Sequence, residues 1–190
     1  MKASHGTECH VQNRMYEVID AAVPSNEDKA IAPSLSEPVQ VRIKLPSRDG
    51  FFHALARGSG WGDYLTSIKL SREAVAKQMR REFADSLDLP ADPMNSIITN
   101  YETFEFKLSK DEVKKELLEN HFLSPEVIEY IAAYVNVRIE MYDAGKTGKI
   151  LFVTSRASGT KFSIRIGTDT LDYYLLGVMM DGKRLKTRFS

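Results

Sequence analysis

The most restrictive feature of the sequence is a helical pattern that runs directly into a strand pattern, over residues 125–143. "PEVIEYIAAYVN" (125–136) has the apolar spacing of a helix, with Ser124 placed to cap it and Pro125 at its first position. "VRIEMYD" (137–143) then alternates apolar and polar residues, which is typical of a half-buried strand. The chain therefore has to place a helix beside a strand.

The remaining segments repeat these two patterns, with helices mainly in the first half and strands mainly in the second. In "LSREAVAKQMRREFADSL" (70–87), Ser71 is a suitable N-cap, and one face carries Val75, Met79, Phe83 and Leu87. The other predicted helices are 51–57 and 111–123, and the other predicted strands are 39–45, 150–155, 161–167 and 173–180. This order predicts an α+β fold, a helix-flanked mixed β-sheet.

The segment before residue 39 has a different composition from the rest. "MYEVIDAAV" (15–23) has the spacing of a short helix, and residues 24–38 are rich in Pro, Ser and charge, as in a loop or linker. We therefore predict an N-terminal extension or linker, partly helical, over residues 1–38, and one domain over residues 39–190.

Composition argues against several classes of function. The 26 basic and 26 acidic residues balance, which gives no electrostatic reason to expect nucleic acid or a membrane as partner. Lys77, Arg80 and Arg81 form a basic helix segment, but acidic residues interleave with them, so we expect a solvated face. The single cysteine, Cys9, fits a reducing compartment such as the cytoplasm, or the host cytosol if the protein comes from a pathogen.

The residues that could carry chemistry form no strong constellation by themselves. The four histidines show no metal-ligand spacing, and "GSGWG" (58–62) lacks the pattern of a phosphate-binding loop. We therefore expect neither a metal nor a cofactor. Cys9 and His10 are adjacent on a terminal segment, where a catalytic dyad is not expected. His53, in the predicted Phe-Phe helix, is the one histidine close to a turn that could carry a site.

Four segments, taken in order, resemble the ovarian-tumour (OTU) class of cysteine-protease deubiquitinases over residues 40–178. That family has a turn of the form Asp-Gly-Asn-Cys leading into a helix of the form Phe-Phe-Arg-Ala-Leu, and here "SRDG" precedes "FFHAL". "LSREAVAKQM" (70–79) is similar to the next helix of the family, and "EVIEYIAAYVNVRIEMYD" (126–143) to its helix-strand unit. "TLDYYLL" (170–176) is similar to the segment that carries the family's catalytic histidine. The resemblance implies a fold of the OTU-like cysteine-protease type.

The resemblance also implies that the catalytic residues are missing. An ungapped match places Gly50 at the nucleophile position and Asp49 just before it, and a match with the Asn-Cys pair deleted leaves no thiol either. At the other end, Asp172 falls on the histidine position. Thiol attack on an amide needs a thiolate and an imidazole that later protonates the leaving amine, and neither residue supplies these groups. We therefore expect a pseudo-enzyme with no catalytic residues.

On this hypothesis the domain acts by binding a protein partner, with ubiquitin as the candidate that the family suggests. Aromatic residues around the former cleft would make the contacts, because such residues are enriched at interface hot spots. The candidate binding residues are Trp61, Tyr64, His53, Tyr173 and Tyr174, although core packing is an alternative for His53 and for the tyrosines.

Two other hypotheses stay open. The chain could be an active hydrolase of this family or a related one whose site is misaligned, with Ser47 or Cys9 as nucleophile. It could instead be a structural or assembly module in a larger viral or bacterial-effector polypeptide, which keeps the fold only as a scaffold.

Overall fold

A computed structural model describes eight ranges of the chain. They are residues 17–20, 39–45, 49–60, 71–90, 99–144, 147–156, 162–180 and 184–190. Within them, no helix combines the length and the apolar character that crossing a membrane requires.

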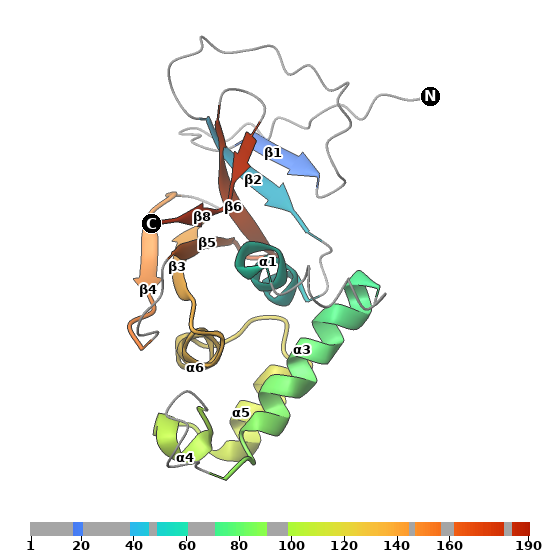
Figure 1. Cartoon of the computed structure of the whole chain (residues 1–190), viewed down its shortest axis with the longest axis vertical. Coiled ribbons are helices and arrows are strands. Elements are labelled where there is room, and N and C mark those ends of the chain that lie inside the picture. Colours follow the sequence, from blue (N-terminus) through green and yellow to red (C-terminus); the bar gives the residue numbers. More distant parts are fainter. Residues whose placement is uncertain are drawn as a thin grey trace.

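One mixed β-sheet forms the upper part of the molecule in Figure 1. Its strands run in the order β1-β2-β6-β5-β3-β4, with β7 paired to β6 and β8 paired to β5. The pairs β1–β2 and β3–β5 are parallel, and the other pairs are antiparallel. The strands are β1 (Glu17–Asp20), β2 (Val39–Lys44), β3 (Arg138–Asp143), β4 (Ile150–Val153), β5 (Ser163–Thr168), β6 (Tyr173–Met180), β7 (Arg184–Lys186) and β8 (Arg188–Phe189).

The helices lie to one side of this sheet (Figure 1). α1 contacts β5 and β6 on one side and α3 on the other, whereas α6 leads into β3 and contacts it. α5 contacts α3 and α6, so it lies one layer further from the sheet. The described helices are α1 (Gly50–Ser59), α3 (Arg72–Ser86), α4 (Tyr101–Phe104), α5 (Lys110–Glu119) and α6 (Pro125–Val135). The predicted α+β class, a helix-flanked mixed sheet, is confirmed.

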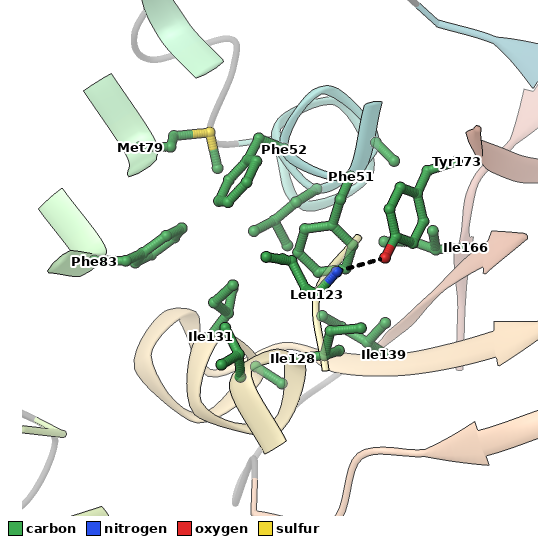
Figure 2. Packing of buried hydrophobic residues seen from close by; sticks show 14 of the residues in the cluster. Phe51, Phe52, Met79, Phe83, Leu123, Ile128, Ile131, Ile139, Ile166 and Tyr173 are labelled. Atoms are coloured by element: carbon green, nitrogen blue, oxygen red, sulfur yellow. Dashed lines mark hydrogen bonds between the residues drawn. The ribbon is translucent and has the colours of Figure 1, made fainter. Parts of the chain in front are cut away.

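The core lies between the sheet and the helices, and α1 runs through its middle. Figure 2 shows Phe51 and Phe52 of α1 pointing to different parts of this core. The Phe51 ring meets Tyr173 of β6 edge-on, whereas the Phe52 ring stacks on Phe83 of α3. Each large apolar side chain buried in this way contributes about 1.5–3 kcal/mol to stability. α1 thus joins the sheet to the outer helices.

Most predicted elements are confirmed, with small shifts at their ends. Ser71 caps α3 by accepting a hydrogen bond from the backbone of Ala74, as its sequence position predicts. Ser124 caps α6 by accepting one from Val127, and Pro125 is the first residue of that helix. The apolar face predicted for α3 is buried throughout, at Val75, Met79, Phe83 and Leu87.

Other predictions were wrong or incomplete. A helix is expected over 15–23, but the described part of that segment, residues 17–20, is the short strand β1, because its backbone pairs in parallel with β2. Pairing in a sheet overrides the weak preference of a four-residue segment. α5 ends at Glu119 rather than at residue 123, and the sequence pattern did not indicate α4, β7 or β8. The domain boundary expected at residue 39 stays a prediction.

Candidate functional site

The site that the sequence indicates begins at the turn before α1. Asp49 adopts a left-handed backbone conformation, with φ 65°, which non-glycine residues rarely adopt. Its side chain does not cap α1 but accepts a hydrogen bond from Nε of Arg80 on α3, at 2.6 Å. The ion pair between Asp49 and Arg80 stabilises this turn and offsets the cost of the left-handed conformation at Asp49.

Arg80 connects the turn to α5 through every part of its guanidinium. Besides the bond to Asp49, its Nη1 donates to the carbonyl of Leu117 at 2.6 Å and its Nη2 to the carbonyl of Asn120 at 2.8 Å. The guanidinium also lies over the ring of Phe52, 4.3 Å from its centroid. The planar guanidinium can donate to one carboxylate and two carbonyls at once while it stacks on a ring. The single ammonium group of a lysine could not make all of these contacts.

This finding corrects the prediction of a solvated basic face on α3. Lys77 and Arg81 are exposed, as expected, but Arg80 is only 6% exposed. The sequence could not distinguish buried Arg80 from its two exposed neighbours. The carboxylate and the two carbonyls that compensate its charge lie 31 to 40 residues away along the chain.

Gly50, the first residue of α1, lies directly against the backbone of Tyr173. A Cβ added to Gly50 would be 3.4 Å from the Cβ and the carbonyl oxygen of Tyr173, and 3.5 Å from its nitrogen. The fold therefore brings the chain at position 50 next to the chain at positions 172 and 173. These are the two segments that the resemblance assigns to the nucleophile and to the histidine.

Asp172 lies in the tight connection between β5 and β6, which Asp169 organises. Oδ1 of Asp169 accepts hydrogen bonds from the backbone N–H groups of Leu171 and Asp172, both at 2.8 Å. Its Oδ2 accepts hydrogen bonds from Arg42 at 2.7 Å and from the Tyr174 hydroxyl at 2.9 Å.

The electrostatics of Asp169 reflect these contacts. Burial by itself would raise the pKa of Asp169, but the hydrogen bonds from the two backbone groups and from Tyr174, with the charge of Arg42, outweigh it and lower that pKa. The ionised carboxylate therefore fixes the conformation of the connection.

His121, from the connection between α5 and α6, lies beside Asp172. Its Nε2 is 2.8 Å from the carbonyl oxygen of Leu171 and 3.7 Å from Oδ1 of Asp172. A carbonyl only accepts, so Nε2 donates and carries a proton in this arrangement. Oδ1 of Asp172 is buried and has no hydrogen-bond partner among the described residues. No local pattern in the sequence predicts that His121 contacts a residue 50 positions away.

Two of the predicted binding residues are buried. His53 is 7% exposed, because α1 is covered by the sheet on one side and by α3 on the other. Tyr173 is 3% exposed, and its hydroxyl accepts a hydrogen bond from the backbone of Leu123 at 3.0 Å (Figure 2). Burial raises the pKa of Tyr173. The expectation that these two side chains offer a surface to a partner is therefore wrong, and core packing accounts for both.

Tyr174 points to the opposite face of the sheet and is only partly buried. The guanidinium of Arg42 stacks over its ring, 3.6 Å from the centroid, while its hydroxyl donates to Asp169. Burial, followed by the bond to Asp169, raises the pKa of Tyr174 to about 12. A role for Tyr174 in binding stays a prediction. Trp61 and Tyr64, the other two candidates, lie outside the described residues.

The described part of this site offers few groups that could act as a nucleophile or as an acid or base. Gly50 has no side chain, Asp172 supplies a carboxylate, and Nε2 of His121 already donates to a carbonyl. The only cysteine of the chain, Cys9, and the hydroxyl candidate Ser47 lie outside the described ranges. No group of three or more His, Cys, Asp or Glu side chains within those ranges could hold a metal ion.

Comparison with solved structures places this arrangement among known folds. A structure described as an ovarian tumour (OTU) domain in complex with ubiquitin superposes with a TM-score of 0.50, over 81% of this chain and 76% of that chain. The chain has an OTU-like fold. Sequence identity to that OTU domain is 17%, at which the likeness shows the fold alone. No family model matches the sequence, and a search of curated proteins finds no match.

Proposed function

We propose that this chain is a catalytically inactive OTU-like domain that binds ubiquitin. The observation that carries the proposal is the contact between Gly50 and Tyr173. In a fold like that of an OTU domain, the two segments expected to hold a thiol and an imidazole lie together, but they carry glycine and Asp172 instead. Loss of both groups removes the nucleophile and the acid, whereas the surface around them can still bind.

Ubiquitin is the proposed partner because the OTU domain that shares this fold was solved in complex with ubiquitin. The proposal predicts that the full chain binds mono-ubiquitin or di-ubiquitin without cleaving it. Binding is measured by titrating the chain into isotope-labelled ubiquitin and following its backbone amide resonances. Saturable shift changes are expected. Their absence at about millimolar protein, which corresponds to a binding free energy weaker than about −4 kcal/mol, rejects ubiquitin as partner.

Inactivity is tested on the same sample. The chain is incubated with di-ubiquitins of each linkage and with a fluorogenic ubiquitin amide, beside an active OTU-family deubiquitinase as positive control. No turnover above that of buffer is expected. Turnover that disappears in a Ser47→Ala or a Cys9→Ala variant would show instead an active hydrolase that uses a nucleophile outside the described residues.

A further inference from the structure

An apolar surface lies next to the Gly50–Tyr173 contact. Leu171, in the β5–β6 connection, is 73% exposed, and Phe122, between α5 and α6, is 42% exposed. His121 joins them, since its ring is 4.6 Å from that of Phe122 and its Nε2 bonds the carbonyl of Leu171. We call Leu171, His121 and Phe122 the hairpin patch. Among the large hydrophobic residues of the described chain, Leu171 is the most exposed.

The hairpin patch is held rigidly although its side chains are exposed. Both polar backbone groups of Leu171 are engaged, its N–H by Asp169 and its carbonyl by His121. The Phe122 ring lies 5.4 Å from that of buried Tyr173. Little conformational entropy would be lost when a partner covers such a surface, which favours a binding role over accidental exposure.

Three carboxylates near the patch have no lysine or arginine as ion-pair partner among the described residues, although Asp172 lies 3.7 Å from Nε2 of His121. Asp172 follows Leu171 directly, and Glu119 is two residues before His121. Glu116, one turn earlier in α5, accepts hydrogen bonds from the backbone and hydroxyl of Ser124. No lysine or arginine among the described residues forms an ion pair with any of these three carboxylates.

Arg80 does not compensate this negative charge. Its guanidinium reaches the carbonyl of Asn120, directly before the patch, but it is already paired with Asp49. The surface therefore combines exposed apolar side chains with carboxylates that no described lysine or arginine pairs with.

From this combination we infer that the hairpin patch binds a peptide segment of the partner in which apolar residues are flanked by lysine or arginine. The apolar residues would cover Leu171 and Phe122, while the flanking cations would approach exposed Glu119 and the partly exposed carboxylates of Glu116 and Asp172. The inference rests on the proposed function, in that it takes the domain to be a binding module. It adds which surface makes the contact and what chemistry that surface selects.

The test measures fluorescence anisotropy of three labelled peptides with the full chain. The probe is Lys-Lys-Leu-Phe-Leu-Lys-Lys; one control replaces every Lys by Glu, and the other replaces Leu-Phe-Leu by Ser-Gly-Ser. We expect the probe to bind and each control to bind at least about tenfold more weakly, which corresponds to a loss of about 1.4 kcal/mol or more of binding free energy, as expected when hot-spot contacts are removed. Equal binding of all three peptides, or no binding of the probe, would overturn the inference.

Matched variants locate the binding surface. Leu171→Ser should weaken binding of the probe by about tenfold. Leu151→Ser, which alters a leucine that is 54% exposed on β4, should leave it unchanged. Glu119→Lys should weaken binding, and Glu102→Lys, at an exposed position on α4, should not. If both leucine variants bind the probe equally well, the hairpin patch is not the site.

The same variants separate this inference from the proposed function. If ubiquitin binds the chain and Leu171→Ser does not weaken that binding or the binding of the probe, the inference fails and ubiquitin binding stands. If the probe binds through Leu171 but ubiquitin gives no shift changes, the inference stands and ubiquitin is the wrong partner.

Discussion

Gly50 occupies a position where a side chain would fit, in spite of its close approach to β6. An added Cβ would lie no nearer than 3.4 Å to Tyr173, which is ordinary van der Waals contact. The backbone at Gly50 is not among the positive-φ positions of the chain. Neither space nor backbone conformation therefore requires glycine here.

This geometry predicts that Gly50→Ala folds normally and is more stable than the wild type by up to about 1 kcal/mol. Alanine restricts the unfolded chain and favours the helix, at no steric cost in the folded state. The free energy of unfolding from urea titrations measures the effect. A loss of more than about 1 kcal/mol would mean that the contact with Tyr173 is tighter than ordinary packing.

Gly58, at the other end of the same helix, provides the control. A Cβ there would meet Ile164 at 3.0 Å and Leu175 at 3.2 Å, both inside the core. Gly58→Ala should therefore destabilise the protein by about 1–3 kcal/mol, as overpacking does. If the two variants behave alike, helix propensity rather than space governs both positions.

Among the elements, α1, α3 and α5 pack together in the core, and one side chain adds a polar link between all three. Arg80 neutralises Asp49 at the start of α1 and binds two carbonyls at the end of α5. The segment that follows α5 carries the hairpin patch, so one guanidinium connects the turn at Gly50 with the surface proposed for binding.

Replacing Arg80 by methionine should destabilise the protein by about 3–5 kcal/mol. The variant keeps an apolar stem but leaves Asp49 as a largely buried, unpaired carboxylate, and such an uncompensated charge is costly. Urea unfolding at neutral pH measures the loss.

The double variant Arg80→Met with Asp49→Asn tests the cause. Removal of the unpaired charge should restore part of the stability, and the two substitutions should not be additive, because the residues are in direct contact. If Asp49→Asn lowers the free energy of unfolding by the same amount in the Arg80→Met protein as in the wild type, the two residues are not coupled. This account of Arg80 would then be wrong.

The molecule as a whole should lose stability in acid. Burial would raise the pKa of Asp169 and of Glu140, but hydrogen bonds and a nearby arginine outweigh it and lower both from their ordinary values of 3.8 and 4.5. A carboxyl with a lowered folded-state pKa contributes stability that is present above its unfolded value and is lost as the pH falls through the folded value. Burial raises the pKa of Glu82, so the contribution of this residue to the pH dependence of stability has the opposite sign.

The free energy of unfolding should therefore fall when the pH is lowered from about 6 to about 3. Asp169→Asn should cost about 2 kcal/mol at neutral pH, because it removes the charge from several hydrogen bonds, and should cost less in acid. Urea titrations of both proteins across this range measure the difference. Parallel curves for the two proteins would show that Asp169 is not a source of the acid sensitivity.

Local chemistry accounts for the elements that were predicted correctly. In α3 the apolar residues recur with the helical period, and Ser71 places a hydroxyl where the first turn needs an acceptor. α6 combines a serine cap with a proline at its first position. These signals act within one or two turns, so the sequence alone contains them. A four-residue strand such as β1 carries no comparable signal, because only its pairing with β2 selects the extended conformation.

The order of residues along the chain is enough to locate most helices and strands, and it shows that positions 50 and 172 carry neither a thiol nor an imidazole. Three further features follow from long-range packing: Gly50 lies next to Tyr173, Arg80 is buried, and His121 lies beside Asp172. Periodicity and capping residues reflect interactions between residues that are close together in the sequence. The long-range contacts of the site join residues 31 to 127 positions apart, and they exist only because the sheet order and the packing of α1 bring those segments together.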